Sequence, residues 1–91
     1  MTRDEAGKYF AELVVFERKT QDIKWGMQSH SPYKWLTILG EEYGEACEAA
    51  LEDKVKPLIY ELVQVAVVAQ ACAEQLMATE ETAKAVLEVG K

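Results

Sequence analysis

A cluster of acids dominates the middle of this sequence. Glu41, Glu42 and Glu45 lie three and four residues apart, so on a helix their side chains converge on one side, and Ile38 on the same stripe indicates that this side faces inward. Residues 35–53 contain six acids and no Lys or Arg. Two carboxylates about 6 Å apart repel by roughly 3 kcal/mol at an effective dielectric near ~20, so the cluster favours a bound proton or cation. The alternative is a solvated acidic face, as on most acid-rich helices.

The next apolar segment supplies one further acid. Glu61, with Gln64 one turn later, stands on an otherwise apolar stretch, where an isolated ionised group is expensive. If the two helices pair antiparallel, Glu61 comes opposite Glu42 and Glu45. Oxygen ligands without histidine or thiol favour Mg²⁺ or Mn²⁺ over zinc, and facing helices of a bundle commonly build such sites.

A second candidate site precedes the acids. Gln21, Trp25 and Gln28 fall on one helical stripe, where an aromatic ring between two amides could stack on a base and hydrogen-bond to its edge. Core packing of Trp25 is the alternative. Four lysines near expected helix ends are candidates for phosphate contacts, and the sequence does not select among them: Lys24, Lys34, Lys54 and Lys56.

Local signals predict where the helices begin. Thr2 and Glu5 form a capping-box pattern, and Ser31 followed by Pro32 is typical of an N-cap with proline at the first helical position. The chain is expected to be one domain, 1–91, with helices over about 2–26, 32–51 and 57–77 and a possible short fourth helix over about 80–89.

Apolar patterning predicts the core. The first helix carries an apolar stripe expected to face inward: Tyr9, Leu13, Phe16, Ile23 and Met27. Residues 62–73 are apolar except for Gln64 and Gln70, which is typical of a buried helix. Three or four short helices cannot cover that helix completely, so we expect self-association.

Composition bounds the class of protein. The chain has 91 residues, of which 49% are hydrophobic, and a net charge of −6, which disfavours binding to a nucleic-acid polymer. Cys47 and Cys72 lie in apolar helical segments and are expected to be reduced core residues of a cytoplasmic protein. The N-terminus lacks a signal-peptide pattern, and the longest apolar run is expected to be too short to cross a membrane.

Two segments together resemble a known family. Glu41-Glu42-Tyr43-Gly44-Glu45, followed after fifteen residues by Glu61-Leu62-Val63-Gln64, resembles the EExxE…ExxD signature of the MazG-like, all-α nucleotide pyrophosphohydrolases. The stretch 21–32 (QDIKWGMQSHSP), with Trp35-Leu36 after it, is similar to the segment that precedes this signature in small phage and bacterial members. The chain departs from the pattern at Gln64, where the family has an aspartate.

The resemblance implies an all-α, MazG-like helical bundle of three to four helices, completed by homo-oligomerisation as a homodimer or dimer of dimers. It implies Mg²⁺-dependent hydrolysis of a nucleoside triphosphate to the monophosphate and pyrophosphate, with Mn²⁺ as an alternative ion. The expected catalytic and metal-binding residues are Glu41, Glu42, Glu45 and Glu61, with Gln64 as a further metal ligand. The expected substrate-binding residues are Gln21, Lys24, Trp25, Gln28 and His30.

The substitution at Gln64 keeps other functions open. A catalytically weak nucleotide-binding module is one alternative, because an amide brings no negative charge to a metal. A helical protein-interaction module is another, in which the acids form a solvated face.

Overall fold

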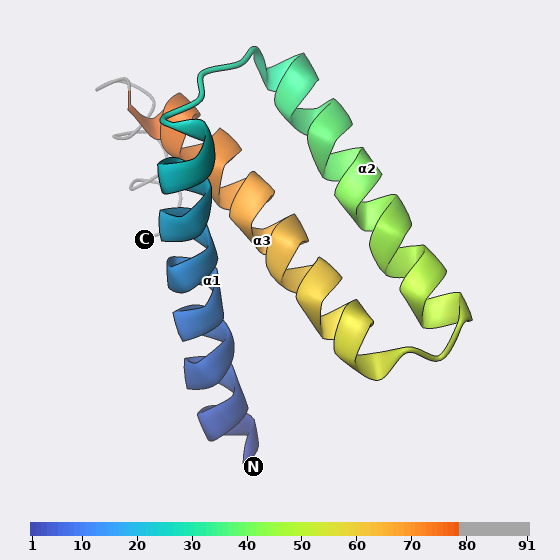
Figure 1. Ribbon diagram of the computed structural model, residues 1–91. Coiled ribbons are helices and arrows are strands. Elements are labelled where there is room, and N and C mark those ends of the chain that lie inside the picture. The colour runs from blue at the N-terminus through green and yellow to red at the C-terminus, as the bar shows by residue number, and fades with distance from the viewer. Residues whose placement is uncertain (79–91) are drawn as a thin grey trace, which may run out of the picture.

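The computed structural model describes residues 1–78 and folds them into three helices, with no strand in that part of the chain. The helices are α1 (Arg3–Trp25), α2 (Pro32–Leu51) and α3 (Val55–Met77). The protein is therefore all-α, as the sequence predicts (Figure 1). The fourth helix expected over about 80–89 lies outside the described residues.

Local chemistry sets the first two helix starts. The Thr2 hydroxyl accepts a hydrogen bond from the Glu5 backbone N–H at 3.1 Å, and the Glu5 carboxylate accepts one from the Thr2 N–H at 3.0 Å, which completes the predicted capping box. Ser31 caps α2 by accepting from the backbone N–H of Lys34 at 3.2 Å, with Pro32 at the first position. Each cap satisfies N–H groups that have no partner within the helix.

Two boundaries depend on backbone that turns sharply. Gly26 ends α1 with a φ of 73°, a region that glycine enters without the steric penalty of a Cβ. Asp53, with a φ of 55°, turns the chain between α2 and α3. α3 begins at Val55, two residues before the predicted start, and Lys54 caps it without a side-chain hydrogen bond.

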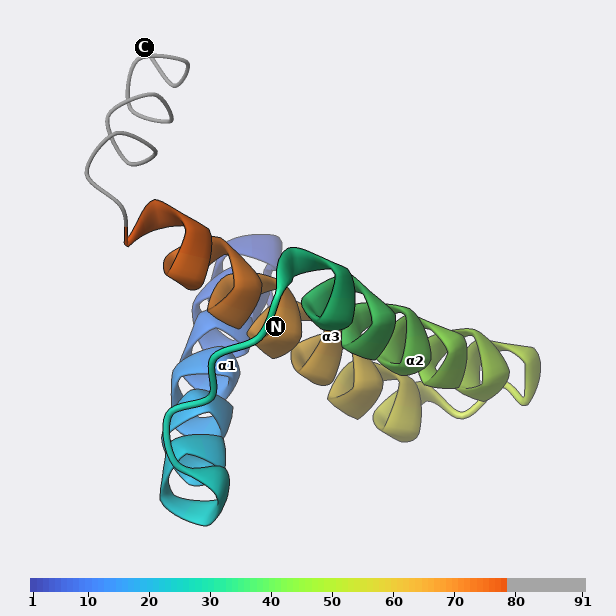
Figure 2. The same ribbon diagram turned by 90° about the horizontal axis from the view of Figure 1, so that it is seen from above.

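α3 is the central element. α2 and α3 form an antiparallel hairpin, and α1 packs on α3 from another side without packing on α2 (Figure 1). Seen from above, α1 crosses the hairpin instead of running along it (Figure 2). Buried side chains among residues 1–78 come from α2 and α3 alone: Trp35, Ala46, Ala49, Val63, Gln64, Val67 and Val68.

The predicted inward stripe of α1 is largely wrong. Four of its five residues are exposed: Tyr9, Phe16, Ile23 and Met27. The partly covered face is rotated around the helix and consists of Phe10, Leu13, Val14, Glu17, Arg18 and Gln21. Because α1 crosses a single partner, α3 covers only a narrow strip of it, and that strip includes polar side chains that hydrogen-bond to α3.

The expectation of a fully buried third helix is also wrong. Only Val63, Gln64, Val67 and Val68 of α3 are buried, and large apolar side chains elsewhere on it are exposed: Val55, Ile59, Tyr60, Leu62, Leu76 and Met77. Two neighbouring helices leave much of its circumference uncovered. Both cysteines are free, but Cys47 is exposed and Cys72 half-buried, so Cys47 is not the core residue expected.

α3 is long and apolar enough to cross a bilayer by length and composition, with a mean hydropathy of 1.3 over its apolar window. The prediction that no apolar run could do so is therefore wrong. This property alone is weak support for a membrane, because the core helix of a soluble protein also has it. α3 carries Glu61 and Gln64 and packs against both other helices, but only 22% of the apolar window is buried.

Candidate metal centre and adjoining pocket

Three glutamates from two helices meet at one point. One carboxylate oxygen each from Glu42, Glu45 and Glu61 lies within 4.8 Å of the other two. Glu42 and Glu45 are one turn apart on α2, and the antiparallel hairpin brings Glu61 of α3 opposite them. Glu41 lies on the exposed side of α2 and is not a member of this group, although the sequence placed it in the same cluster.

Burial and neighbouring negative charge disfavour the ionisation of Glu42 and Glu61. Partial burial raises the pKa of Glu42, and the charges of Glu45, Glu61 and Glu41 raise it further. Burial also raises the pKa of Glu61, to which a hydrogen bond and the charge of Glu45 add. Oε2 of Glu61 is buried without a hydrogen-bond partner. An unpartnered carboxylate oxygen beside two further carboxylates fits a hard divalent cation. Such a cation would offset the repulsion between the carboxylates and give the Glu61 oxygen a partner.

Gln64 does not present a free oxygen to this cluster. The residue is only 6% exposed, and its Oε1 accepts a hydrogen bond from Nε2 of Gln21 at 2.9 Å. Its own Nε2 is buried without a partner. The predicted metal ligand therefore links α3 to α1, and its oxygen already accepts one hydrogen bond there.

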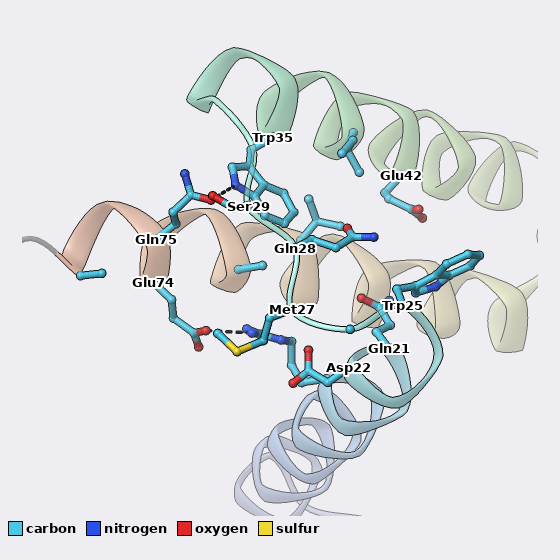
Figure 3. Close-up of a pocket in the computed structure, with 16 residues that line it drawn as sticks. Gln21, Asp22, Trp25, Met27, Gln28, Ser29, Trp35, Glu42, Glu74 and Gln75 are labelled. Atoms are coloured by element: carbon cyan, nitrogen blue, oxygen red, sulfur yellow. Dashed lines mark hydrogen bonds and ion pairs between the residues drawn. The ribbon is translucent and has the colours of Figure 1, made fainter.

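A pocket of about 610 Å³ adjoins the glutamates. It lies over α3 between the C-terminal half of α1 and the N-terminal half of α2, with Gly26 to Ser29 of the connecting loop along its rim. Gln21, Trp25 and Gln28 line it, and so does Glu42, through which the pocket borders the carboxylate cluster. Figure 3 shows Trp25 and Gln21 of α1 facing Glu42 of α2 across this space.

His30 serves the loop and does not line the pocket. Its ring stacks edge-on against Trp35, with the ring centres 4.8 Å apart, and its Nε2 lies 3.3 Å from Oε1 of Gln28. Oε1 of Gln75 accepts hydrogen bonds from the His30 N–H at 3.0 Å and from Nε1 of Trp35 at 2.9 Å, and Nε2 of Gln75 donates to the His30 carbonyl oxygen. Gln75, which sequence reasoning missed, thereby ties the loop and α2 to α3.

None of the four candidate lysines is among the residues that line the pocket. Nζ of Lys24 lies 4.9 Å from the centre of the Trp25 ring, a cation–π contact at the pocket's edge. Lys54 pairs with Glu52 in the turn between α2 and α3, and Lys56 lines a different, apolar groove between α1 and α3. No lysine lines the pocket within residues 1–78, so the structure gives no support to a phosphate contact by Lys24.

The pocket's cationic side chain is one that sequence reasoning missed. Arg18 lines the pocket, and its Nη2 forms an ion pair with Oε1 of Glu74 at 2.8 Å. The two residues are 56 positions apart, so no local spacing signals their contact. The stripe of α1 that was expected to face inward does not include Arg18.

Comparisons of this chain with protein families, with curated proteins and with solved structures found no match.

Proposed function

We propose that this protein is a Mg²⁺-dependent nucleoside triphosphate pyrophosphohydrolase that releases the monophosphate and pyrophosphate. One observation carries the proposal: carboxylate oxygens of Glu42, Glu45 and Glu61 lie within 4.8 Å of one another beside a pocket of about 610 Å³. The resemblance of residues 21–36, 41–45 and 61–64 to MazG-like proteins supports the same reading. A cytoplasmic location belongs to the proposal.

The proposed metal ligands are Glu42, Glu45 and Glu61. Bound there, Mg²⁺ would supply charge neutralisation for the phosphates and Lewis-acid activation of a water. One of the glutamates would also accept the proton of an attacking water as general base. Glu41, exposed on the outer side of α2, raises the negative potential of the site without being one of the three close ligands.

The proposed base-binding side chains come from α1 and the loop that follows it. Trp25 presents a largely exposed ring that is free to stack on a base, and Lys24 beside it adds positive charge at the pocket's edge. Gln28 lines the same pocket and carries both a donor and an acceptor for the edge of a base. Gln21 donates to Gln64, so its contribution is to position α1 against α3.

Self-association is part of the proposed architecture. A groove of about 410 Å³ between α1 and α3 is lined mostly by apolar residues, with one acid and one lysine: Tyr9, Leu13, Phe16, Glu17, Lys56, Ile59, Tyr60 and Val63. A second copy of this chain, related by a two-fold axis, could cover this groove. A homodimer, or a dimer of dimers, would cover the exposed apolar residues of α1 and α3.

The hydrogen bond that Gln64 accepts from Gln21 favours one alternative to an efficient enzyme. With only three close carboxylates, and an amide engaged by Gln21 where the family has an aspartate, the site could bind a nucleotide and turn it over slowly. That protein would be a nucleotide-binding module with weak catalysis. The alternative shares the pocket and the metal ligands and differs only in rate.

The test is a panel of nucleoside triphosphates incubated with Mg²⁺ or with EDTA, with products resolved by chromatography. We expect monophosphate and pyrophosphate in equal amounts with Mg²⁺ only, and none from Glu42→Gln. Glu48→Gln is the matched control, since it neutralises an exposed acid of α2 outside the cluster. Diphosphate and inorganic phosphate as products, or equal activity in Glu42→Gln, would contradict the proposal. Mg²⁺-dependent nucleotide binding without products would favour the binding module.

A further inference from the structure

We propose that Arg18 is the anion-binding residue of the pocket and that it binds a phosphate group directly. In the free protein Glu74 pairs with Arg18, until an anionic ligand replaces the Glu74 carboxylate. The inference deepens the proposed function and rests on it, because it takes the pocket's ligand to be a nucleotide. It assigns the phosphates a second point of attachment, away from the glutamates. Neither residue belongs to the sequence motif. The packing of α1 on α3 brings their two side chains together.

The guanidinium of Arg18 has unused hydrogen-bonding capacity. The side chain lines the pocket and is 21% exposed, yet its Nη1 is buried without a partner. Within residues 1–78 it forms one ion pair, with Glu74, through Nη2. A guanidinium presents five N–H donors in a planar fork that matches two oxygens of a phosphate, and an unmet buried donor is unfavourable. Nη1 is enclosed in the free protein, so a phosphate could bond to it only if the Arg18 side chain moves as Glu74 leaves.

Glu74 is suited to be displaced. Its side chain is 52% exposed, so its carboxylate can return to water at little cost. A single N–O contact of 2.8 Å holds it to Arg18, whereas a phosphate could accept from both Nη atoms once the arginine side chain has moved to expose Nη1. The pair therefore keeps the half-buried arginine neutralised in the free protein and exchanges one anion for another on binding.

The charges around the pocket define which ligand fits. Arg18 is the one Lys or Arg among the described residues that line it, against Asp22, Glu42 and Glu74. A free anion therefore meets net repulsion, which a divalent cation at the glutamates would remove. Figure 3 shows Glu42 and Glu74 on opposite sides of the pocket, so a metal-bridged phosphate and an arginine-bound phosphate would occupy its two ends. The arrangement fits a polyphosphate better than a single phosphate.

The test uses inorganic pyrophosphate as the probe, titrated into the full-length protein with saturating Mg²⁺. Trp25 and Trp35 line the pocket, so intrinsic fluorescence reports occupancy without any turnover. Arg18→Gln should weaken binding about tenfold or more, the scale of a charge-assisted hydrogen bond. Glu74→Gln should tighten binding several-fold, because it removes the competing carboxylate. Lys19→Gln is the matched control: it removes the same charge from the next, exposed position of α1.

The opposite sign expected for the two partners separates a binding role from a structural one. If Glu74→Gln weakens binding as Arg18→Gln does, the pair only holds α1 on α3 and the inference is wrong. Equal effects of Arg18→Gln and Lys19→Gln would overturn it as well. Should Arg18→Gln unfold, the direction of the Glu74→Gln effect still decides. Pyrophosphate binding that depends on Arg18 in a protein without nucleotide turnover would reject the proposed function and leave Arg18 as the anion site.

Discussion

The α2–α3 hairpin and α1 are held in different ways. Every buried residue described belongs to the hairpin, whereas α1 has none and rests on α3 through a narrow strip. Two of its contacts with α3 are polar, Gln21 with Gln64 and Arg18 with Glu74. The hairpin is therefore the stable frame that carries the carboxylates, and α1 brings the proposed ligand-binding side chains to it. This difference predicts that substitutions in the two regions have unequal effects on stability and ligand binding.

The largest difference should appear between two valines. Val67 of α3 is 1% exposed, and Val67→Ala should lower the free energy of unfolding by about 2–3 kcal/mol through lost burial and a residual cavity. Val15 of α1 is exposed, so Val15→Ala should change the free energy of unfolding by less than about 0.5 kcal/mol. Chemical denaturation measures both. Comparable losses would mean that α1 is as tightly packed as the hairpin.

The next effect concerns the side chain that ties the loop to the hairpin. Gln75→Ala removes hydrogen bonds to the His30 backbone and to Nε1 of Trp35, and should destabilise the protein by about 2 kcal/mol. Hydrogen exchange should also show faster opening of residues 26–31. Gln70→Ala, at an exposed position of α3, is the control. An unchanged loop in Gln75→Ala would show that the pocket's rim is held by other contacts.

A smaller effect of opposite sign is expected within the hairpin. Glu42→Gln removes a partly buried charge that Glu45 and Glu61 repel, so without metal it should stabilise the protein. Because Glu42 is largely solvated, we expect only about 1 kcal/mol of the Coulombic repulsion to be recovered. The melting temperature in EDTA should rise by roughly 4–8 °C relative to wild type, and Glu48→Gln should not change it. A lower melting temperature for Glu42→Gln would mean that its carboxylate is stabilising.

The smallest effect is the pH dependence of stability. The folded protein holds the pKa of Glu42 and Glu61 above the ordinary value of 4.5, so it binds their protons more tightly than the unfolded chain does. This contribution to stability is complete below pH 4.5 and is lost as the pH rises through the raised values. In EDTA, wild type should therefore lose more stability than Glu42→Gln on going from about pH 5 to 7. Parallel pH profiles for the two proteins would show that the cluster does not couple to folding.

Short-range signals predicted the helices well. The Thr2–Glu5 capping box and the Ser31–Pro32 start act within one turn, so they can be read from adjacent residues. The meeting of Glu61 with Glu42 and Glu45 could also be anticipated, because a short connection forces two helices to lie antiparallel. The missing side-chain cap at Lys54 explains why the start of α3 was placed two residues too late.

Contacts between distant segments could not be predicted. Several stripes of α1 contain apolar residues, and only its crossing on α3 decides that Leu13 and Gln21 face inward while Phe16 and Ile23 do not. Arg18 meets Glu74 for the same reason, and no spacing along the chain indicates that pair. The resemblance to a sequence motif predicted Gln64 as a metal ligand, but the hydrogen bond from Gln21 depends on the tertiary arrangement.

The most direct test of the account is calorimetric titration of the metal-free protein with Mg²⁺. We predict saturable binding by wild type that Glu42→Gln and Glu61→Gln each weaken at least tenfold, whereas Glu48→Gln leaves it unchanged. Glu41→Gln should have a smaller effect, because its side chain lies outside the group of three. No saturable binding by wild type, or equal losses in Glu42→Gln and Glu48→Gln, would contradict the claim that the α2–α3 hairpin builds a metal site.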